Sequence, residues 1–236
     1  MIFLRNRISN NIDEMQKNMG ESYWNISASG IAFRSIFNNY LEKYSEGRLL
    51  DVGAGNLLYK HLLEKYCSSY ESLDVKEDAK LDYVQDIQDT NLSSSVFDTV
   101  FCRNVLEHVE KPREALTEIS RILKQDGIAI ISVPHLAYLH NEPEDYYRFT
   151  KYGVEEISSQ TDLEIIEVEE AGGLFSFLGY VFSTVFMGLT YDVAILSWFT
   201  YRINYIIQHG CVMIDNLSGT DIYMPLNYVF VLKNSS

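Results

Sequence analysis

The chain has 236 residues, of which 47% are hydrophobic, so it is long enough to fold around a core of its own. Its 33 acidic and 19 basic residues give a formal net charge of −14, and no run of Lys or Arg forms a stripe that could neutralise phosphates. The composition therefore argues against nucleic acid as a partner.

The cysteines and the first residues bear on the compartment. Cys67, Cys102 and Cys211 are scattered and form no CxxC pair, so we interpret them as reduced thiols and predict no metal site. The start, MIFLRNRISN, holds no apolar run of signal-peptide length. We therefore expect a cytoplasmic protein.

Residues 1–46 are predicted to be helical, because apolar residues recur at near-helical spacing in SASGIAFRSIFNNYLEKYSEG and the pattern stops at Gly47. From residue 47 short apolar strands alternate with helices. Strands are expected in RLLDVG, YESLDV, LDYVQDI, FDTVFCRN and IAIISVP, and helices in LLYKHLLEKY and PREALTEISRILKQDG. This alternation is typical of an α/β protein with a mostly parallel sheet covered by helices on both faces.

After a further helix, YGVEEISSQT, come the strand LEIIEVEEAG and, much later, the last clear strand, NYVFVLKN. An apolar segment lies between these two strands. We predict one domain with four parts, which are N-terminal helices (1–46), a cofactor-binding core (47–171), an apolar helical insertion (172–221) and the final strand (222–236).

The stretch LLDVGAGN places Gly53 and Gly55 directly after the first strand of the core, where a nucleotide-like ligand approaches a parallel sheet. Two glycines alone also fit a tight turn that needs positive φ. Asp74 ends the second strand and is suited to accept hydrogen bonds from both hydroxyls of a ribose. Asp86 ends the third strand and is suited to accept from an adenine amino group, with the N–H of Ile87 as a donor beside it.

The loop does not match the dinucleotide fingerprint G-x-G-x-x-G, because Leu58 stands where the last glycine is needed. Asp51 also places a carboxylate ahead of the turn. An acid there suits a cofactor with an amino-acid end and a sulfonium better than it suits a pyrophosphate.

Five stretches, LLDVGAGN, LDV, QDI, FDTVFCRNVLEHV and EISRILKQDGIAIISVP, resemble in order and spacing the motifs of class I S-adenosylmethionine-dependent methyltransferases. The resemblance covers about residues 45–170. It implies a Rossmann-like, doubly wound, seven-stranded sheet that is mostly parallel, with NYVFVLKN as an antiparallel last strand. It also implies S-adenosyl-L-methionine as the cofactor.

The resemblance assigns roles to residues at the strand ends. The implied cofactor-binding residues are Asp51, Gly53, Gly55, Asn56, Asp74, Val75, Asp86, Ile87, Arg103 and Asn104. Many members have a third glycine where this chain has Leu57. His108, in LEHV, is suited to accept a proton, but we favour packing at a helix end.

The resemblance further implies that the acceptor enters above the fifth strand, where the chain reads SVPHLAYLHNEPEDYYRFTKYG. His135 and His140 are the candidate catalytic bases, and Tyr147 and Arg148 the candidate substrate-binding residues. Arg148 is suited to hold a carboxylate or phosphate of the substrate, or else to pair with a neighbouring acid such as Asp145.

The insertion has no charged residue from Ala171 to Tyr191, but the limb that follows carries Arg202 and His209 near its middle. We favour helices that cap the substrate site or form a dimer face over peripheral membrane contact, and both over a true membrane span.

We predict a methyltransferase that acts on a small-molecule or glycan-type acceptor. A lipid-linked acceptor is included in this class. The alternative is a non-catalytic module that holds S-adenosylmethionine or S-adenosylhomocysteine and acts through a protein–protein surface.

Overall fold

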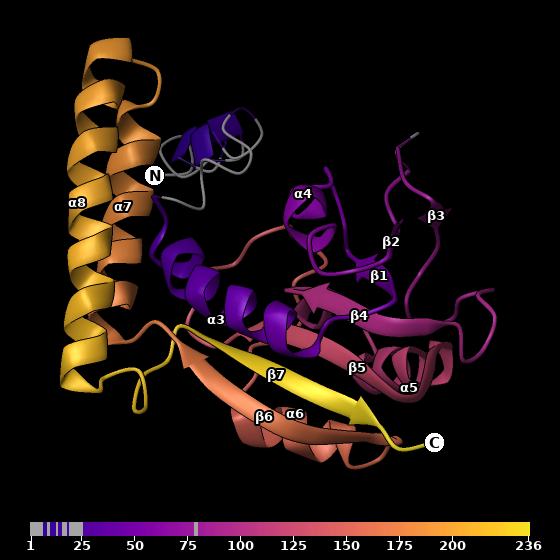
Figure 1. Cartoon of the computed structure of the whole chain (residues 1–236). Coiled ribbons are helices and arrows are strands. Elements are labelled where there is room, and N and C mark those ends of the chain that lie inside the picture. Colours follow the sequence, from indigo (N-terminus) through magenta and orange to yellow (C-terminus); the bar gives the residue numbers. More distant parts are fainter. Residues whose placement is uncertain (1–6, 9, 13, 16–17, 19–25, 78–79) are drawn as a thin grey trace. The chain divides into compact units, whose positions relative to one another are not determined.

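The computed structural model describes residues 7–8, 10–12, 14–15, 18, 26–77 and 80–236 (Figure 1). The chain divides into two compact units, one of residues 36–169 and 227–236 and one of residues 1–35 and 170–226. The single-domain organisation stays a prediction.

A seven-stranded sheet in the order β3-β2-β1-β4-β5-β7-β6 forms the framework (Figure 1). The strands are β1 (Arg48–Val52), β2 (Ser69–Asp74), β3 (Tyr83–Val84), β4 (Phe97–Arg103), β5 (Leu123–Pro134), β6 (Leu163–Ala171) and β7 (Asn227–Asn234). Neighbouring strands from β3 to β5 are parallel, and β7 runs antiparallel to β5. The predicted fold class, with its antiparallel last strand, is confirmed.

The helices whose bounds the structure describes are α3 (Ala28–Tyr44), α4 (Lys60–Leu63), the 3-10 helix η1 (Leu106–His108), α5 (Pro112–Ile122), α6 (Lys151–Ser158), α7 (Leu174–Thr190) and α8 (Ala194–Ser218). Helix α5 begins with Pro112, whose missing N–H costs nothing in the first turn. Thr150 caps α6, because its hydroxyl accepts a 3.1 Å hydrogen bond from the Gly153 N–H. Helix α4 is shorter than the helix predicted for LLYKHLLEKY.

The core lies along the central strands. Residues of β4, β5 and β7 such as Val100, Ile130 and Val231 are fully buried. These strands are apolar on both faces rather than alternating, because helices cover both sides of a doubly wound sheet. A rigid sheet of this kind fixes the positions of the loops at its strand ends.

The second unit contains the insertion, which folds as the pair of helices α7 and α8 joined by a short turn (Figure 1). Asp215 of α8 is fully buried and accepts hydrogen bonds of 2.7 to 3.0 Å from the backbone N–H groups of Gly173, Phe175 and Ser176, so it caps the start of α7. Among the described residues, no helix combines the length and apolar character that crossing a bilayer requires.

Candidate active site

The loop after β1 takes the left-handed conformation at Gly53, Gly55 and Leu57, with φ of 73°, 50° and 59°. A Cβ atom at Gly53 would lie 2.3 Å from Cγ2 of Val105, so a side chain of the protein itself excludes any other residue there. A Cβ atom at Gly55 would meet nothing within 4 Å. Open space therefore lies against the backbone at Gly55, where a ligand has room.

Leu57 explains how the loop manages without the third glycine of many family members. Its φ lies in the region that glycine adopts without strain and that a leucine adopts at a cost. The loop therefore keeps a left-handed turn at this position although the residue has changed.

Asp74 connects the end of β2 to this loop. Its Oδ2 accepts a 2.9 Å hydrogen bond from the Gly55 N–H, and its Oδ1 accepts one of 2.9 Å from the Lys76 N–H. A carboxylate has about four acceptor positions, so both oxygens retain capacity for a ligand's hydroxyls. The next residue, Val75, has an exposed side chain.

Asp51 lies beneath the loop rather than on its surface. Its side chain is buried, and its Oδ2 accepts a 2.8 Å hydrogen bond from the Tyr70 hydroxyl. Burial raises the pKa of Asp51 to about 7, the Tyr70 hydrogen bond opposes this, and the nearby charge of Asp74 adds to it. Asp51 is thus poised to change its charge near neutral pH.

Asp86 and Ile87 follow β3. The Asp86 carboxylate is exposed and accepts a 2.9 Å hydrogen bond from the N–H of Gln88, whereas the Ile87 side chain is buried. Asn56, in the glycine loop, is exposed. Two neighbouring parallel strands thus each have an acid at or just after their end, the half-buried Asp74, which binds the Gly55 N–H, and the exposed Asp86.

Arg103 and Asn104 end β4. The Arg103 guanidinium lies 5.1 Å from the ring centre of Tyr59. Asn104 has a φ of 50°, its N–H donates to the carbonyl of Ser132, and its Oδ1 accepts a 2.8 Å hydrogen bond from the Ser132 hydroxyl. These bonds join the carboxyl ends of β4 and β5.

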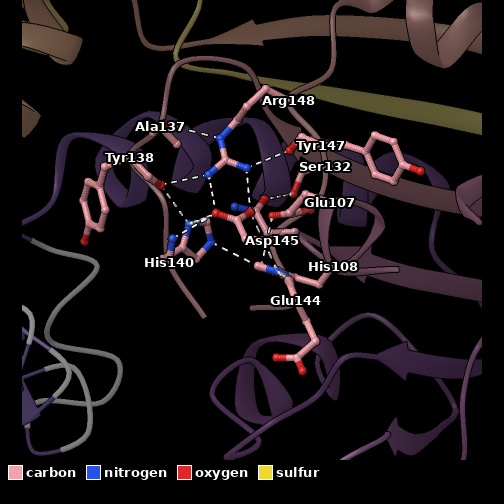
Figure 2. A network of polar contacts seen from close by, with 11 residues as sticks. Glu107, His108, Ser132, Ala137, Tyr138, His140, Glu144, Asp145, Tyr147 and Arg148 are labelled. Atoms are coloured by element: carbon pink, nitrogen blue, oxygen red, sulfur yellow. Dashed lines mark hydrogen bonds and ion pairs between the residues drawn. The ribbon is translucent and has the colours of Figure 1, made fainter. Parts of the chain in front are cut away.

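The segment after β5 is held by Arg148 (Figure 2). Its guanidinium donates two 2.7 Å hydrogen bonds to the Asp145 carboxylate and one each to the carbonyls of Ala137, Tyr138 and Tyr147. These bonds use all five donors of an arginine. Of the two roles that the sequence allowed for Arg148, the structure shows the pairing with Asp145. In this arrangement no N–H group of Arg148 is left to bind a substrate.

Tyr147 points away from Arg148 (Figure 2). Its hydroxyl donates a 2.8 Å hydrogen bond to the carbonyl of Glu110, and its ring packs 5.6 Å from that of Phe149. The side chain is 38% exposed, so part of its ring is open to a substrate.

The two candidate bases lie in different surroundings. His135 is half-buried, its Nδ1 is 2.9 Å from the carbonyl of Phe149, and its ring packs against Tyr228. His140 instead meets His108, with 3.2 Å between the two Nε2 atoms (Figure 2). The structure therefore places His140 against His108, which we interpreted from the sequence as a residue that packs at a helix end.

Glu107 was missed by the sequence analysis. It is fully buried, and neither oxygen of its carboxylate has a hydrogen-bond partner among the residues that the structure describes. Burial raises the pKa of Glu107 to about 8 and lowers that of His108. The adjacent acid and histidine of LEHV were the available signal, but their apolar neighbours suggested packing.

The residues around the glycine loop fit S-adenosylmethionine. The open space at Gly55 admits a ligand to the backbone. The carboxylates of Asp74 and Asp86 are acceptors for the hydroxyl and amino groups that an adenosine presents. Hence the residues at the ends of β1, β2 and β3 are complementary to the adenosine part of the cofactor.

Comparison with protein families agrees with this chemistry. Residues 50–131 match the family model described as a methyltransferase domain. The ubiquinone biosynthesis O-methyltransferase of Rickettsia typhi is 26% identical over 155 residues, which are 53% of this chain and 63% of that protein. The enzyme of the same name from Rickettsia bellii is 26% identical over 205 residues, which are 70% of this chain and 84% of that protein.

Solved structures share the fold. The 1,6-didemethyltoxoflavin-N1-methyltransferase of Burkholderia thailandensis, with S-adenosylhomocysteine bound, superposes with a TM-score of 0.58 at 12% identity over 98% of this chain and 89% of that chain. Phosphoethanolamine N-methyltransferase 2 of Haemonchus contortus, in complex with S-adenosylmethionine, gives 0.55 at 16% identity over 95% of this chain and 60% of that chain. Residues 50–131 are therefore similar to a methyltransferase domain, and the sheet order and these solved structures show that the chain has the fold of such S-adenosylmethionine-binding methyltransferases.

Proposed function

We propose that this protein transfers the methyl group of S-adenosylmethionine to a small-molecule acceptor. The observation that carries the proposal is the open space at Gly55 beside the carboxylate of Asp74, which already binds the N–H of that glycine. A cofactor whose amino-acid part lies against this turn and whose ribose reaches Asp74 satisfies both features. The relatives named as O-methyltransferases support a hydroxyl as the group that is methylated.

In this proposal Asp74 accepts hydrogen bonds from the ribose hydroxyls, and Asp86 with the N–H of Ile87 binds the adenine. Gly53, Gly55 and Asn56 form the turn against which the amino-acid part lies. The remaining cofactor-binding positions of the proposal are Asp51 below the turn, Val75 beside the adenosine, and Arg103 and Asn104 at the end of β4.

The bound cofactor supplies an electrophilic methyl group on its sulfonium. The chain's own contribution is to align the acceptor oxygen with that methyl group and to remove the hydroxyl proton. Of the two predicted bases, His135 is better supported, because Nε2 of His140 already faces Nε2 of His108 at 3.2 Å. Because the Phe149 carbonyl can only accept, Nδ1 of His135 carries the proton, and Nε2 is left as the proton acceptor.

The test is a transfer assay with methyl-labelled S-adenosylmethionine and a panel of hydroxyl-bearing small molecules. We expect His135→Gln to bind S-adenosylhomocysteine as the parent does and to transfer label at least about a hundredfold more slowly. His61→Gln, at an exposed position of α4, is the matched control and keeps the parent rate. A parent protein that binds the cofactor but labels no acceptor supports the non-catalytic binding module instead.

Exposed apolar side chains on the insertion support a second part of the proposal, peripheral contact with a membrane. They are Leu178, Val181, Phe182, Val185 and Phe186 on α7 and Ile195, Leu196, Trp198, Phe199, Ile203, Tyr205, Ile206, Ile207, Met213, Ile214 and Leu217 on α8. Neighbouring residues such as Ile206 and Ile207 point about 100° apart, so the apolar surface of α8 is wider than a single stripe, whereas Asn204 and Gln208 on the opposite side are buried. A wide apolar face of this kind suits a helix that lies in the plane of the bilayer interface with that face among the acyl chains.

Charge agrees with such contact. Residues 172–226 contain no Lys and one Arg, Arg202, so insertion of apolar side chains rather than attraction to anionic lipid is the driving force. A lipid-linked or otherwise apolar acceptor suits an enzyme at that surface. A homodimer through the same helices is the competing use.

A further inference from the structure

We propose that Glu107, His108 and His140 bind a divalent transition-metal ion of the zinc class. One ligand atom from each residue lies within 4.8 Å of the others (Figure 2). Glu107 and His108 come from η1 after β4, and His140 from the segment after β5, so two loops at neighbouring strand ends build the cluster.

The histidine tautomers expose metal-binding lone pairs. Nδ1 of His108 lies 2.5 Å from the carbonyl of Glu144, and Nδ1 of His140 lies 3.1 Å from the carbonyl of Tyr138. A carbonyl only accepts, so each Nδ1 carries the ring's proton and each Nε2 presents a lone pair. The two Nε2 atoms are 3.2 Å apart, and two facing lone pairs repel unless a cation lies between them.

Asp145 reinforces this tautomer at both rings. Its carboxylate oxygens lie 3.9 Å from Nδ1 of His108 and 3.7 Å from Nδ1 of His140, and Arg148 fixes the carboxylate through both oxygens. The carbonyls of Glu144 and Tyr138 orient the two rings, and Asp145 adds a negative charge beside both.

Glu107 supplies the negative charge. Its oxygens are buried without a hydrogen-bond partner among the described residues, and Oε1 lies 3.8 Å from Nε2 of His108. A buried carboxyl group without a partner keeps its proton, and a bound cation displaces that proton and gains a charged oxygen ligand. The lone pairs of His108 and His140 and this carboxylate need the same missing partner.

The spacing and the donor types fit zinc. Two ligands about 2.1 Å from a tetrahedral zinc lie roughly 3.4 Å from each other, which matches the histidine pair. Imidazole nitrogens favour zinc, iron, nickel or copper over magnesium or calcium. Three protein ligands leave a coordination position open. If the proposed function holds, the open coordination position is suited to an oxygen atom of the methyl acceptor.

The experiment is a titration of the full-length, chelator-treated protein with Co²⁺, followed by competition with Zn²⁺. We expect one Co²⁺ per chain with the visible absorption of a four- or five-coordinate ion, lost on adding zinc. His108→Ala and His140→Ala should weaken binding about a hundredfold or more, whereas the matched control His61→Ala should not change it. Far-UV circular dichroism shows which variants are folded.

X-ray absorption of the zinc-loaded parent protein provides a readout that needs no variant, and we expect two imidazole ligands. The proposal would be overturned if the parent protein shows no cobalt absorption, or if folded His108→Ala and His140→Ala proteins bind cobalt like the parent. The short distance between the two rings would then be explained by a shared proton. S-adenosylhomocysteine binding is measured on the same samples. Metal binding without cofactor binding would overturn the proposed function and support this inference.

Discussion

At the scale of single residues, the loop after β1 shows three separate reasons for one backbone conformation. Gly53 is required by the Val105 side chain, Gly55 faces open space, and Leu57 takes a left-handed φ with a full side chain. The glycines were recognisable from the sequence because glycine is the usual residue at such a turn. Their different causes were not, because Val105 belongs to a segment about fifty residues further along the chain.

Leu57→Gly should stabilise the protein by up to about 1 kcal/mol, because the left-handed region costs a leucine roughly 1 to 2 kcal/mol and glycine's greater unfolded-state entropy offsets part of the gain. The measurement is chemical unfolding. Leu58→Gly, at a neighbour without positive φ, is the control and should destabilise. Equal destabilisation by both substitutions would show that Leu57 is not strained.

Asp51 makes stability depend on pH. Its pKa rises from an ordinary value near 4 to about 7 on folding, so the folded protein holds a proton that the unfolded chain releases between those values. Stability from this group is therefore present at low pH and falls as pH rises through 7. Asp51→Asn, which still accepts from Tyr70, should remove this dependence and stabilise the protein by about 2 to 4 kcal/mol at pH 8 relative to the parent.

The check is unfolding of both proteins at pH 4.5 and pH 8, compared as a difference so that other titrating groups cancel. The difference should grow with pH. A constant difference across that range would mean that Asp51 titrates normally in the folded protein.

At the scale of elements, the two ends of the insertion meet at the sheet, while its helices also pack on Asn11, Ile12 and Ile26 of the same unit. The N–H of Leu226 donates a 3.0 Å hydrogen bond to the carbonyl of Gly172, so the two ends of the insertion already meet. The sequence predicted helices here from apolar content, and α7 and α8 are such helices. Their buried polar contacts through Asp215 were not predictable, because they depend on how the two helices pack.

The full chain should sediment with neutral phosphatidylcholine vesicles, and the fraction that sediments should not depend on the salt concentration. A protein in which a short turn replaces residues 173–225 should fold but no longer sediment with these vesicles. In the full chain, Phe182→Ser with Ile206→Ser should weaken vesicle binding at least about tenfold, since each buried side chain contributes roughly 1.5 to 3 kcal/mol.

Tyr152→Ser, which removes an exposed aromatic ring from α6 in the other unit, is the matched control and should bind vesicles like the parent. If the full chain stays in the supernatant and light scattering shows a dimer that Phe182→Ser with Ile206→Ser dissociates, the apolar surface is a dimer face instead.

At the scale of the whole molecule, the pattern of strands and acids was sufficient to predict the fold and the placement of Asp74 and Asp86 at strand ends, because both follow from local periodicity and from parallel sheet geometry. The cluster of Glu107, His108 and His140 was beyond that reasoning. Its members come from two loops whose meeting depends on the bonds of Arg148, and a loop's path is set by tertiary contacts rather than by periodicity.

The central claim, that the ends of β1 to β3 bind the adenosine of the cofactor, is tested most directly by calorimetric titration of S-adenosylhomocysteine into the folded parent protein and Asp74→Ala. Losing charge-assisted bonds to two ribose hydroxyls, about 3 kcal/mol together, should weaken binding about a hundredfold or more. Asp162→Ala, at an exposed position before β6, should bind like the parent. A folded parent that binds no S-adenosylhomocysteine, or an Asp74→Ala protein within about threefold of the parent, would contradict the account.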